Sequence, residues 1–491
     1  MTNSRNSPFE IDQTDFRTIG HQLVDSIADF LSKIGDVKIT PGETPLQVQK
    51  LMGNPAFPIG SSSVVELFSH TSDLLLKHSL FNGHPKFFGY ITGSPAPVGI
   101  LSEMLAATIN PNCGAQILSP VATEIEKQVI RWLAEFVGVS PGYGGILVSG
   151  GNMANLTAFL AGRTAMLGKQ VKTDGLRNGK QSVVYCSKTT HTWIEKAANL
   201  FGFGTNSIRW IQTDENNKMS GEALEQAINA DFAEGLQPMM VIGTAGDVST
   251  GVVDDLSQLS MISKKYKLWF HVDGAYGIPA AVLPELKEMF KGIEEADSIA
   301  LDPHKWLYSP LEAGCTLVKN PAHLSDTYSS HPDYYNFNTS GEGSELNFYE
   351  YGFQNSRGFR ALKVWMMLQH VGKQGYIESI REDVELARLM YELAEQHPEL
   401  DAVTHNLSIT TLRFVPIGYE VKDEDNAKFL NRLNETLLNR LQVGGKVFFS
   451  NALVKGEYCL RACIVNFRTS RKDIQETIEI VVREGRSLAS Q

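Results

Sequence analysis

The sequence predicts an α/β protein with a mostly parallel sheet, and three observations favour this fold class. Between about residues 100 and 320, strand-like apolar runs alternate with helical segments. Several runs, such as SVVYCS and PMMVIGTAG, are almost continuously apolar, as expected for strands that are buried on both faces of a parallel sheet. The chain of 491 residues is too long for one ordinary hydrophobic core, so we expect two or three lobes.

The candidate elements of this central region follow one another in a regular order. GGILVSGG leads into the helical stretch NMANLTAFLAGRTAML, and SVVYCS leads into the helical stretch HTWIEKAANLF. Further apolar runs predict strands in PMMVIGTAG, KLWFHVDGAYG, SIALDPHKW and AGCTLVKN. This alternation is typical of a large α/β domain.

The segment before the central region predicts a helical arm. Residues 14–34 carry apolar side chains at helical spacing, so they predict an amphipathic helix. Its apolar stripe must cover either the core of this chain or a partner subunit. Residues 35–65 are rich in Gly, Pro and Ser and predict an arm of irregular course.

The pattern changes again after about residue 325. A polar, tyrosine-rich stretch there predicts a long loop, which is followed by the helical RGFRALKVWMMLQHVG and a smaller α+β segment. Strands of that segment are expected near SITTLRFVP and YCLRACIVNFR. We therefore predict an N-terminal helical arm (1–95), a large α/β domain (96–375) and a small C-terminal α+β domain (376–491).

The composition argues against several classes of function. A net charge of −11 and a pI of about 5.6 leave no basic field for nucleic acid or an anionic membrane. No apolar run approaches the ~20 residues of a membrane helix, and the N-terminus lacks the apolar core of a signal peptide. The five cysteines fit no zinc motif, so we expect free thiols, no metal site and a cytoplasmic enzyme.

Residues that follow strands carry the candidate chemistry, because ligands of parallel α/β sheets bind beyond the carboxyl ends of the strands. In LVSGGNMANL, Gly150 and Gly151 let the backbone approach a ligand closely. The N–H groups of Gly151 and Asn152 begin the next helix, where a phosphate is favoured. An ordinary tight turn between a strand and a helix explains this motif about as well.

Asp273 and Lys305 follow two other strands and favour one cofactor. Asp273 needs a cationic or N–H partner when it is buried. A metal would serve, although no clear third ligand lies nearby, and so would a protonated heterocyclic nitrogen. Lys305 lies beside His304 and Asp302, and a buried lysine that forms a Schiff base with an aldehyde cofactor is accounted for because its amine is consumed. Pyridoxal 5'-phosphate satisfies both residues, because Asp273 would pair with its pyridinium nitrogen.

His191 in YCSKTTHTWIEKA adds a fourth residue just after a strand. A flat imidazole there is able to stack on the cofactor ring and face the carboxylate of a substrate. Taken alone, His191 fits a helix cap or a packed core histidine better. It is the order of these elements, each at a strand end, that favours pyridoxal phosphate.

The chain resembles the pyridoxal-phosphate-dependent group II amino-acid decarboxylases, the aromatic-L-amino-acid decarboxylase family. The resemblance covers nearly the whole chain and includes His191. The other motifs that carry it are HPKFFGYI (84–91), LSPVATEIE (118–126), VSGGNMAN (148–155), HVDGAYG (271–277), DPHKWL (302–307) and FRALKVW (359–365).

This resemblance implies the fold, the activity and the assembly of the protein. The fold implied is the aspartate-aminotransferase-like fold type I with a seven-stranded sheet. The activity implied is decarboxylation of an L-amino acid, aromatic by first choice, to the amine and CO₂. The assembly implied is an obligate homodimer with the active site at the interface, which the N-terminal helix embraces.

The resemblance also implies roles for single residues. Lys305 would be the Schiff-base lysine, Asp273 the partner of the ring nitrogen and His191 the stacking residue. Ala275 would pack beneath the ring, and Tyr90 and Thr92 would line the substrate pocket. The phosphate contacts implied are Gly151, Asn152 and His304, with Asp302 beside them, and Gly150 belongs to the same cofactor site.

The chain departs from the family pattern in two strand-end motifs. The family often has Gly-Thr-Thr before the aspartate motif, where TAGDVSTG places Asp247 and Val248, so a hydroxyl contact is lost or shifted. The family histidine is usually followed by two serines, whereas Thr192 and Trp193 follow His191 here. We expect Trp193 to shrink or reshape the site.

A third feature concerns the loop over residues 330–356, which we predict to be a mobile lid because it is polar and contains Gly341 and Gly343. The family loop carries a tyrosine that protonates the substrate carbon after CO₂ leaves. Tyr349, or failing that Tyr351, is expected in this role, acting across the dimer interface. If the adjacent Phe348 holds that place instead, chemistry that yields an aldehyde is expected.

Other functions stay open at this point. The pocket-side segment NPNCGAQ (110–116) is small and polar where aromatic decarboxylases tend to carry bulkier groups, so a non-aromatic substrate is one alternative. An aldehyde synthase or an aminotransferase of the same fold is another. A nucleotide-binding oxidoreductase built on VSGGNMAN would need an acidic ribose residue ~20 positions further on, which is not evident. A non-catalytic binding protein is disfavoured because Lys305, Asp273 and His191 are all present.

Overall fold

A computed structural model describes residues 7–176, 179–330, 346–419 and 424–490. Its centre is a seven-stranded sheet of order β1-β7-β6-β5-β4-β2-β3. Strand β7 is antiparallel to both β1 and β6, and all other neighbouring strands are parallel. This sheet confirms the predicted fold class. Its strands are β1 (Gly144–Val148), β2 (Ser182–Ser187), β3 (Ile208–Ile211), β4 (Gln237–Thr244), β5 (Trp269–Asp273), β6 (Ser298–Leu301) and β7 (Gly314–Val318).

Helices bury both faces of this sheet, which explains the continuous apolar runs of its strands. Val183 and Tyr185 of β2 belong to the core under α5, α9 and α10, whereas Val184 and Cys186 belong to the core under α6 and α8. Side chains of one strand alternate between the two faces, so most positions of a strand that is covered on both faces are apolar. The helices are α4 (Pro97–Ile109), α5 (Pro120–Val137), α6 (Gly151–Leu167), α7 (Val171–Asp174), α8 (Trp193–Leu200), α9 (Gly221–Ala233), α10 (Leu256–Tyr266) and α11 (Ala322–Tyr328).

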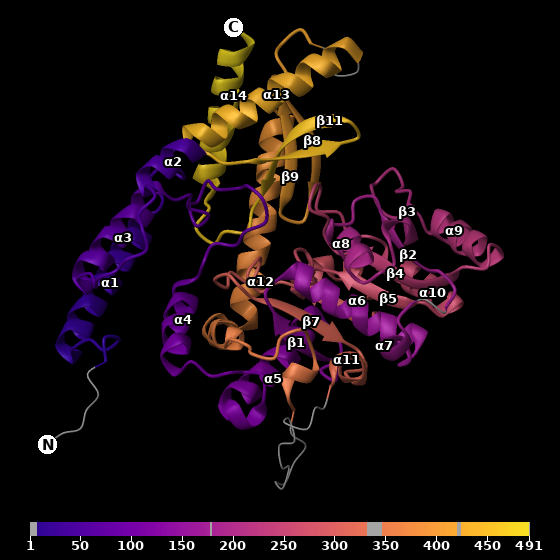
Figure 1. Cartoon of the computed structure of the whole chain (residues 1–491). Helices are drawn as coiled ribbons and strands as arrows, with labels where there is room; N and C mark the ends of the chain where they lie inside the picture. The colour runs from indigo at the N-terminus through magenta and orange to yellow at the C-terminus, as the bar shows by residue number, and fades with distance from the viewer. Residues whose placement is uncertain (1–6, 177–178, 331–345, 420–423, 491) are drawn as a thin grey trace, which may run out of the picture.

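The C-terminal region forms a second, smaller sheet that lies above the first in Figure 1. Its four strands are antiparallel in the order β10-β11-β9-β8, and they pack on α13, α14 and the end of α12. Helix α12 contributes side chains to the cores of both sheets. The elements are α12 (Arg360–Glu395), β8 (Leu400–Asn406), β9 (Ile409–Phe414), α13 (Glu424–Gly444), β10 (Ser450–Val454), β11 (Glu457–Cys463) and α14 (Arg471–Ala489).

The N-terminal arm runs along one side of the molecule (Figure 1) and consists of α1 (Gln13–Lys33), α2 (Pro45–Met52) and α3 (Val64–His78). The predicted amphipathic helix is α1. The expectation of an irregular course over residues 35–65 is wrong at α2. Thr44 begins this helix with a capping box, in which its side chain accepts the Gln47 N–H and the Gln47 side chain accepts the Thr44 N–H. These local hydrogen bonds outweigh the Gly- and Pro-rich composition around them.

Among the described residues, no helix is long and apolar enough to cross a membrane. The domain boundaries at residues 95 and 375 stay predictions. Strands β4, β5 and β6 all end at one edge of the large sheet, near the start of α6, and this edge is where a ligand site is expected.

Candidate active site

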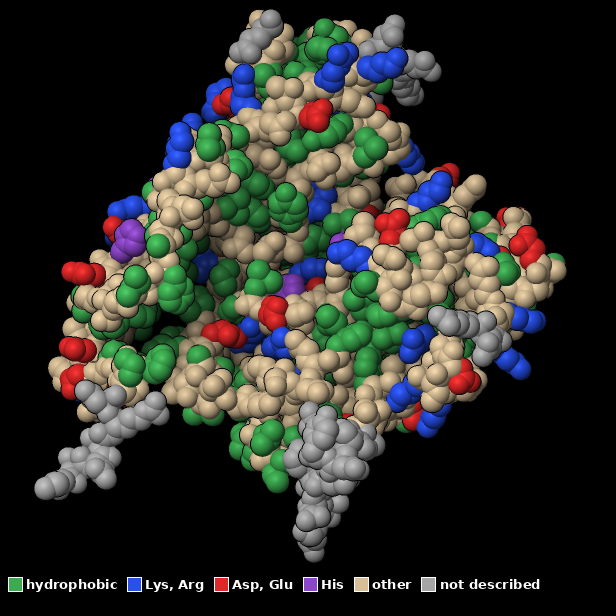
Figure 2. All heavy atoms as spheres, viewed as in Figure 1, with side chains coloured by type: hydrophobic (Ala, Val, Ile, Leu, Met, Phe, Trp, Pro, Cys, Tyr) green, Lys and Arg blue, Asp and Glu red, His purple; other side chains and the backbone are tan. Residues whose placement is uncertain are grey.

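A cavity of about 460 Å³ lies at this edge of the sheet. Its walls come from the residues after β1, β4, β5 and β6, from the arm segment at Tyr90, and from Arg461 of β11. In Figure 2, histidine and charged side chains gather in a hollow near the middle of the face that is shown. The cavity therefore brings together most of the residues that the sequence singled out, and it adds others.

Lys305 lies in this cavity beside a buried carboxylate. Its Nζ is 3.0 Å from Oδ2 of Asp302, and the Gly151 N–H donates to the same oxygen at 2.9 Å. The other oxygen, Oδ1, is buried and has no hydrogen-bond partner among the described residues. Asp302 thus links the lysine to the first residue of α6 and leaves one acceptor open.

The glycines at the start of α6 are required by close packing. A Cβ at Gly150 would lie 3.0 Å from Cε1 of His304, and one at Gly151 would lie 2.7 Å from Oδ2 of Asp302. Any larger residue would push the helix start away from the turn that carries Lys305. The N-terminus of the 17-residue α6 therefore opens into the cavity, where its dipole favours an anion.

His304 supports this helix start with a defined tautomer. The Ala313 N–H donates to its Nδ1 at 3.1 Å, so the proton of the neutral ring is on Nε2. Burial lowers the pKa of His304, which keeps the ring neutral near pH 7. Its ring also faces Gly150, so its N–H is available near the anion-binding helix end.

Asp273 closes the opposite part of the cavity at the end of β5. Its side chain is buried, and it accepts the Trp193 indole N–H at 2.7 Å on Oδ2 and the Ala275 N–H at 3.2 Å on Oδ1. His271, two residues earlier, does not pair with it. Burial lowers the pKa of His271 to about 4, so this imidazole is neutral.

A directional hydrogen-bond chain holds His271. The Trp269 indole donates to Ser298 Oγ at 2.8 Å, so the Ser298 hydroxyl donates to His271 Nδ1 at 2.9 Å. His271 Nε2 then donates to Oδ1 of Asn155 at 2.7 Å, and Asn155 lines the cavity. His271 therefore fixes β5 against β6 and α6 and is not itself free for chemistry.

His191 and Tyr90 lie on the wall of the cavity, as the sequence predicted, whereas Thr92 does not line it in this chain. Partial burial lowers the pKa of His191, with nearby Asp273 opposing this effect. Tyr90 is held by its backbone, since its N–H donates to Ser450 Oγ at 3.2 Å. The arm segment packs closely here, because a Cβ at Gly93 would lie 2.2 Å from the Lys305 carbonyl oxygen.

Arg461 is a cavity residue that the sequence reasoning missed. It is buried, and its guanidinium donates to the carbonyl oxygens of Val248, at 2.5 Å, and Tyr90. Its Nε has no hydrogen-bond partner among the described residues. The available signal was an arginine within the otherwise apolar strand YCLRACIV, because a buried arginine requires acceptors.

The two departures from the family pattern have different outcomes. Asp247 is used within its own turn, where its carboxylate accepts the N–H groups of Ser249 at 2.8 Å, Thr250 at 3.0 Å and Val252 at 3.0 Å. Val248 lies on the cavity wall. Trp193 is buried behind Asp273 and does not line the cavity described above.

Tyr349 and Tyr351 lie in and after the short 3₁₀ turn Phe348–Glu350 and do not line the Lys305 cavity of their own chain. The Tyr349 N–H donates to the Gly114 carbonyl at 3.0 Å, so this turn packs on the 110–116 segment. Phe348 is buried, with the Arg357 guanidinium 5.0 Å from its ring centroid. The lid positions Gly341 and Gly343 lie outside the described residues.

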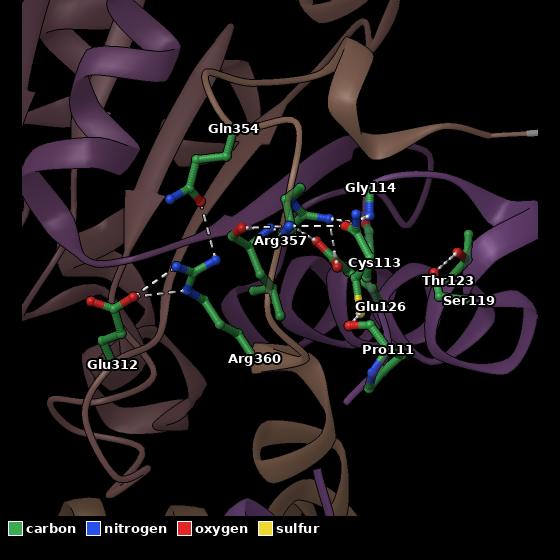
Figure 3. A network of polar contacts seen from close by, with 12 residues as sticks. Pro111, Cys113, Gly114, Ser119, Thr123, Glu126, Glu312, Gln354, Arg357 and Arg360 are labelled. Atoms are coloured by element: carbon green, nitrogen blue, oxygen red, sulfur yellow. Dashed lines mark hydrogen bonds and ion pairs between the residues drawn. The ribbon is translucent and has the colours of Figure 1, made fainter. Parts of the chain in front are cut away.

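A buried ion pair fixes the 110–116 segment and the turn Phe348–Glu350 to the large sheet (Figure 3). Arg357 donates to Glu126 at 2.5 and 3.0 Å, to the Cys113 carbonyl at 2.8 Å and to the Leu147 carbonyl at 2.8 Å. Glu126 in turn accepts the Leu147 N–H at 2.9 Å. Five hydrogen bonds therefore connect α5, β1, Cys113 and the segment that leads from the 3₁₀ turn to α12.

Nearby, Arg360 joins the same region to the cavity. Its guanidinium donates to Oε1 of Glu312 at 2.7 and 3.1 Å and to Gln354 at 3.3 Å, as Figure 3 shows. Glu312 also lines the Lys305 cavity.

Burial raises the pKa of Cys113 to about 11, so this thiol stays protonated and is a packing residue.

We predict that Arg357→Met destabilises the protein by about 3–5 kcal/mol, because Glu126 is left buried and unpaired. Urea unfolding followed by circular dichroism measures this change. Arg131→Met is the matched control, since the Arg131–Glu135 pair is 3.8 Å long and about half exposed. The control should lose at most ~1 kcal/mol. Equal destabilisation of the two variants would contradict the importance of the buried pair.

Comparisons with known proteins show the family of the chain. The model of the pyridoxal-dependent decarboxylase conserved domain matches residues 45–415. An aromatic-L-amino-acid decarboxylase of Bacillus atrophaeus is 31% identical over 95% of this chain and 94% of its own. Tyrosine decarboxylase 2 of Arabidopsis thaliana is 33% identical over 97% of this chain and 88% of its own. A phenylacetaldehyde synthase of a Rosa hybrid cultivar is 28% identical over 98% of this chain and 96% of its own.

Solved structures share the fold over almost the whole chain. Oryza sativa TDC with PLP and tryptamine has a TM-score of 0.89 at 25% identity, covering 99% of this chain and 100% of that one. Mouse CSAD has a TM-score of 0.90 at 23% identity, covering 96% and 99%, and at that identity it supports the fold alone. These matches confirm the predicted fold type.

Proposed function

The chain belongs to the pyridoxal-dependent decarboxylase family, and we propose that it converts an aromatic L-amino acid to the amine and CO₂, with Lys305 as the residue that binds the cofactor aldehyde. The enzyme class, an amino-acid carboxy-lyase that uses pyridoxal phosphate, follows from the family. The observation that carries the assignment of residues is the single cavity that contains Lys305, Asp273, His191 and the start of α6.

The residues of the cavity fit pyridoxal phosphate. The close-packed glycines and the N-terminus of α6 suit its phosphate, with the neutral His304 beside them. The buried carboxylate of Asp273 is a partner for the ring nitrogen, and Ala275 lines the cavity next to it. When bound, the cofactor supplies an electron sink for the charge that develops as CO₂ leaves.

The protein's own groups have distinct tasks in this reaction. Asp302 holds the Lys305 amine 3.0 Å from its Oδ2 and so positions it before the cofactor binds. His191 lies on the cavity wall, and its lowered pKa keeps it neutral near pH 7, so it is able to hydrogen-bond to a substrate carboxylate without a full counter-charge. Arg461 holds the arm at Tyr90 against the loop after β4 and so excludes water from that wall.

An aromatic substrate is supported by the names of the relatives, which include decarboxylases of aromatic amino acids and of tyrosine. Tyr90 and Val248 give the cavity apolar surface beside its charged groups. The small residues of the 110–116 segment favour instead a decarboxylase of a non-aromatic amino acid, which is the alternative within the family. Assaying a panel of L-amino acids for CO₂ release decides between the two.

Aldehyde synthesis is a second candidate, and the turn that carries Phe348 is the observation that favours it. The buried Phe348 directly precedes Tyr349, and one relative is a phenylacetaldehyde synthase. Such an enzyme takes up O₂ and water and releases the aldehyde, CO₂, ammonia and hydrogen peroxide. The nature of the product therefore separates the two activities.

The same loop generates a prediction about the proton donor. Tyr349→Phe or Tyr351→Phe should reduce amine formation at least about 10²-fold if that tyrosine protonates the substrate carbon. The measurement is the amount of amine, CO₂, aldehyde and hydrogen peroxide formed per substrate consumed. The affected variant should still bind cofactor and should gain aldehyde. If both variants form amine at the parental rate, the donor is another residue, and His191 is the next candidate.

Lys305→Ala should lower turnover by more than about 10³-fold, since the covalent contact to the cofactor is lost. Borohydride reduction of the holoenzyme followed by mass mapping should place the cofactor on Lys305. Lys188→Ala is the control, because Lys188 is exposed and does not line the cavity, and it should keep both activity and the adduct. An adduct on another lysine would refute the assignment.

A homodimer accounts for the apolar surface of the arm and of α4. Exposed apolar side chains gather on these helices, and the apolar surface on the left of Figure 2 belongs to this region. A patch of this kind marks an association surface. The exposed apolar residues of the arm and α4 include Phe16, Leu67, Phe68, Leu101, Met104, Leu105 and Ile109, and Ile117 and Val121 follow them in the chain.

We predict that Leu101→Asp combined with Leu105→Asp yields monomers of 54.2 kDa without decarboxylase activity. These leucines are 58% and 50% exposed in the single chain, and aspartates there would be desolvated by a partner. Light scattering after gel filtration measures the mass. Met261→Asp, at a residue of α10 that is 61% exposed, is the control and should stay dimeric. A double variant that is dimeric and active would contradict this interface.

A further inference from the structure

Trp193 is the first residue of α8 and follows His191 by two positions. Its side chain is 0% exposed and among the largest of the fully buried side chains. The indole lies edge-on to His271, with ring centroids 5.6 Å apart, and edge-on to Phe159 at 6.4 Å. These contacts from β5 and α6 hold the ring in one orientation.

In that orientation the indole N–H points at Asp273. Nε1 of Trp193 donates to Oδ2 of Asp273 at 2.7 Å, the shorter of the two hydrogen bonds that this carboxylate receives. The other donor is the backbone N–H of Ala275 at 3.2 Å. Over the part of the chain that the structure describes, Trp193 is thus the one side-chain donor to Asp273.

A carboxylate that is 6% exposed is stable in its charged form only if donors replace the lost water. His271, two residues before Asp273 on β5, is neutral and is engaged by Ser298 and Asn155. An indole N–H is always a donor and never an acceptor, so it favours the charged carboxylate over the neutral acid. The seryl hydroxyl that the resemblance leads one to expect at this position would be able to turn and accept instead.

We propose that Trp193 is a positioning residue that gives the Asp273 carboxylate its side-chain hydrogen bond and orients it for the ring nitrogen of the cofactor. This inference rests on the role of Asp273 under the proposed function. Trp193 acts through Asp273 and does not line the cavity itself. Trp193, where the family usually has a serine, therefore changes the hydrogen bonding of Asp273 and not the wall of the cavity.

Cofactor affinity of the cofactor-free protein tests this inference through a double-mutant cycle. Pyridoxal phosphate is titrated into the parent, Trp193→Phe, Asp273→Asn and the double variant. Trp193→Phe keeps an aromatic ring but removes the N–H, and it should raise the Kd about tenfold. In the Asp273→Asn background the same change should raise the Kd less than about threefold, because the charged acceptor is already gone.

Trp365→Phe is the matched control. It also removes a hydrogen-bonded indole, since Nε1 of Trp365 donates to Gln128 at 3.1 Å, but this contact joins α12 to α5 away from the cavity. The control should bind cofactor as the parent does. A tenfold effect of Trp193→Phe in both backgrounds would show a merely structural role and overturn the proposal. If Asp273→Asn alone leaves affinity and turnover unchanged, the role of Asp273 fails instead.

The contact itself is measurable without cofactor. In ¹⁵N-indole spectra of the cofactor-free protein, Asp273→Asn should shift one N–H signal upfield and speed its exchange with solvent. Trp193→Phe should remove that same signal. If Trp193→Phe does not fold, the change in Asp273→Asn alone carries the test, because no other indole of the described chain donates to Asp273. Spectra without any shifted indole signal would refute the contact.

Discussion

The cavity keeps several charged groups away from water, and much of the surrounding structure supplies them with partners. An unpaired buried charge costs several kcal/mol, so each group constrains the elements that surround it. Asp302 illustrates this constraint, because its Oδ2 accepts the Gly151 N–H and lies 3.0 Å from Lys305 Nζ. The start of α6 and the turn after β6 are therefore held together by the same carboxylate that positions the lysine.

Arg461 extends this constraint to the small sheet. Its guanidinium comes from β11 and binds carbonyl oxygens of Tyr90 in the arm segment and Val248 after β4. The cavity wall is complete only when the small sheet, the arm segment and the large sheet are all in place. An arginine suits this task because its several donors remain charged at every physiological pH.

The Glu126–Arg357 pair performs a similar function behind the cavity. It connects β1 and α5 to the 110–116 segment and to the start of α12, whose later part packs on the small sheet. The turn with Phe348 and Tyr349 packs on this support. This turn is thus supported by a buried ion pair and not by loop contacts alone.

The sequence by itself determined the fold class and the strand ends of β1, β5 and β6. It also singled out Lys305, Asp273 and the paired glycines, which the structure places in one cavity. It did so because local patterns carry that information: continuous apolar runs predict covered strands, and the motifs follow them directly. Strands β3, β8 and β10 gave no such signal. In β10 buried and exposed residues alternate, and most residues of β8 are only partly buried.

Only the tertiary structure decided which distant groups meet. Trp193 and Asp273 are 80 residues apart, and Arg357 and Glu126 are 231 residues apart, so no local pattern relates them. Trp193 was expected to reshape the pocket and instead supports Asp273 from behind. Contacts of this kind depend on how α8 packs against β5, and that packing is set by the whole core: a buried donor finds its acceptor only after the helices and the sheet have assembled.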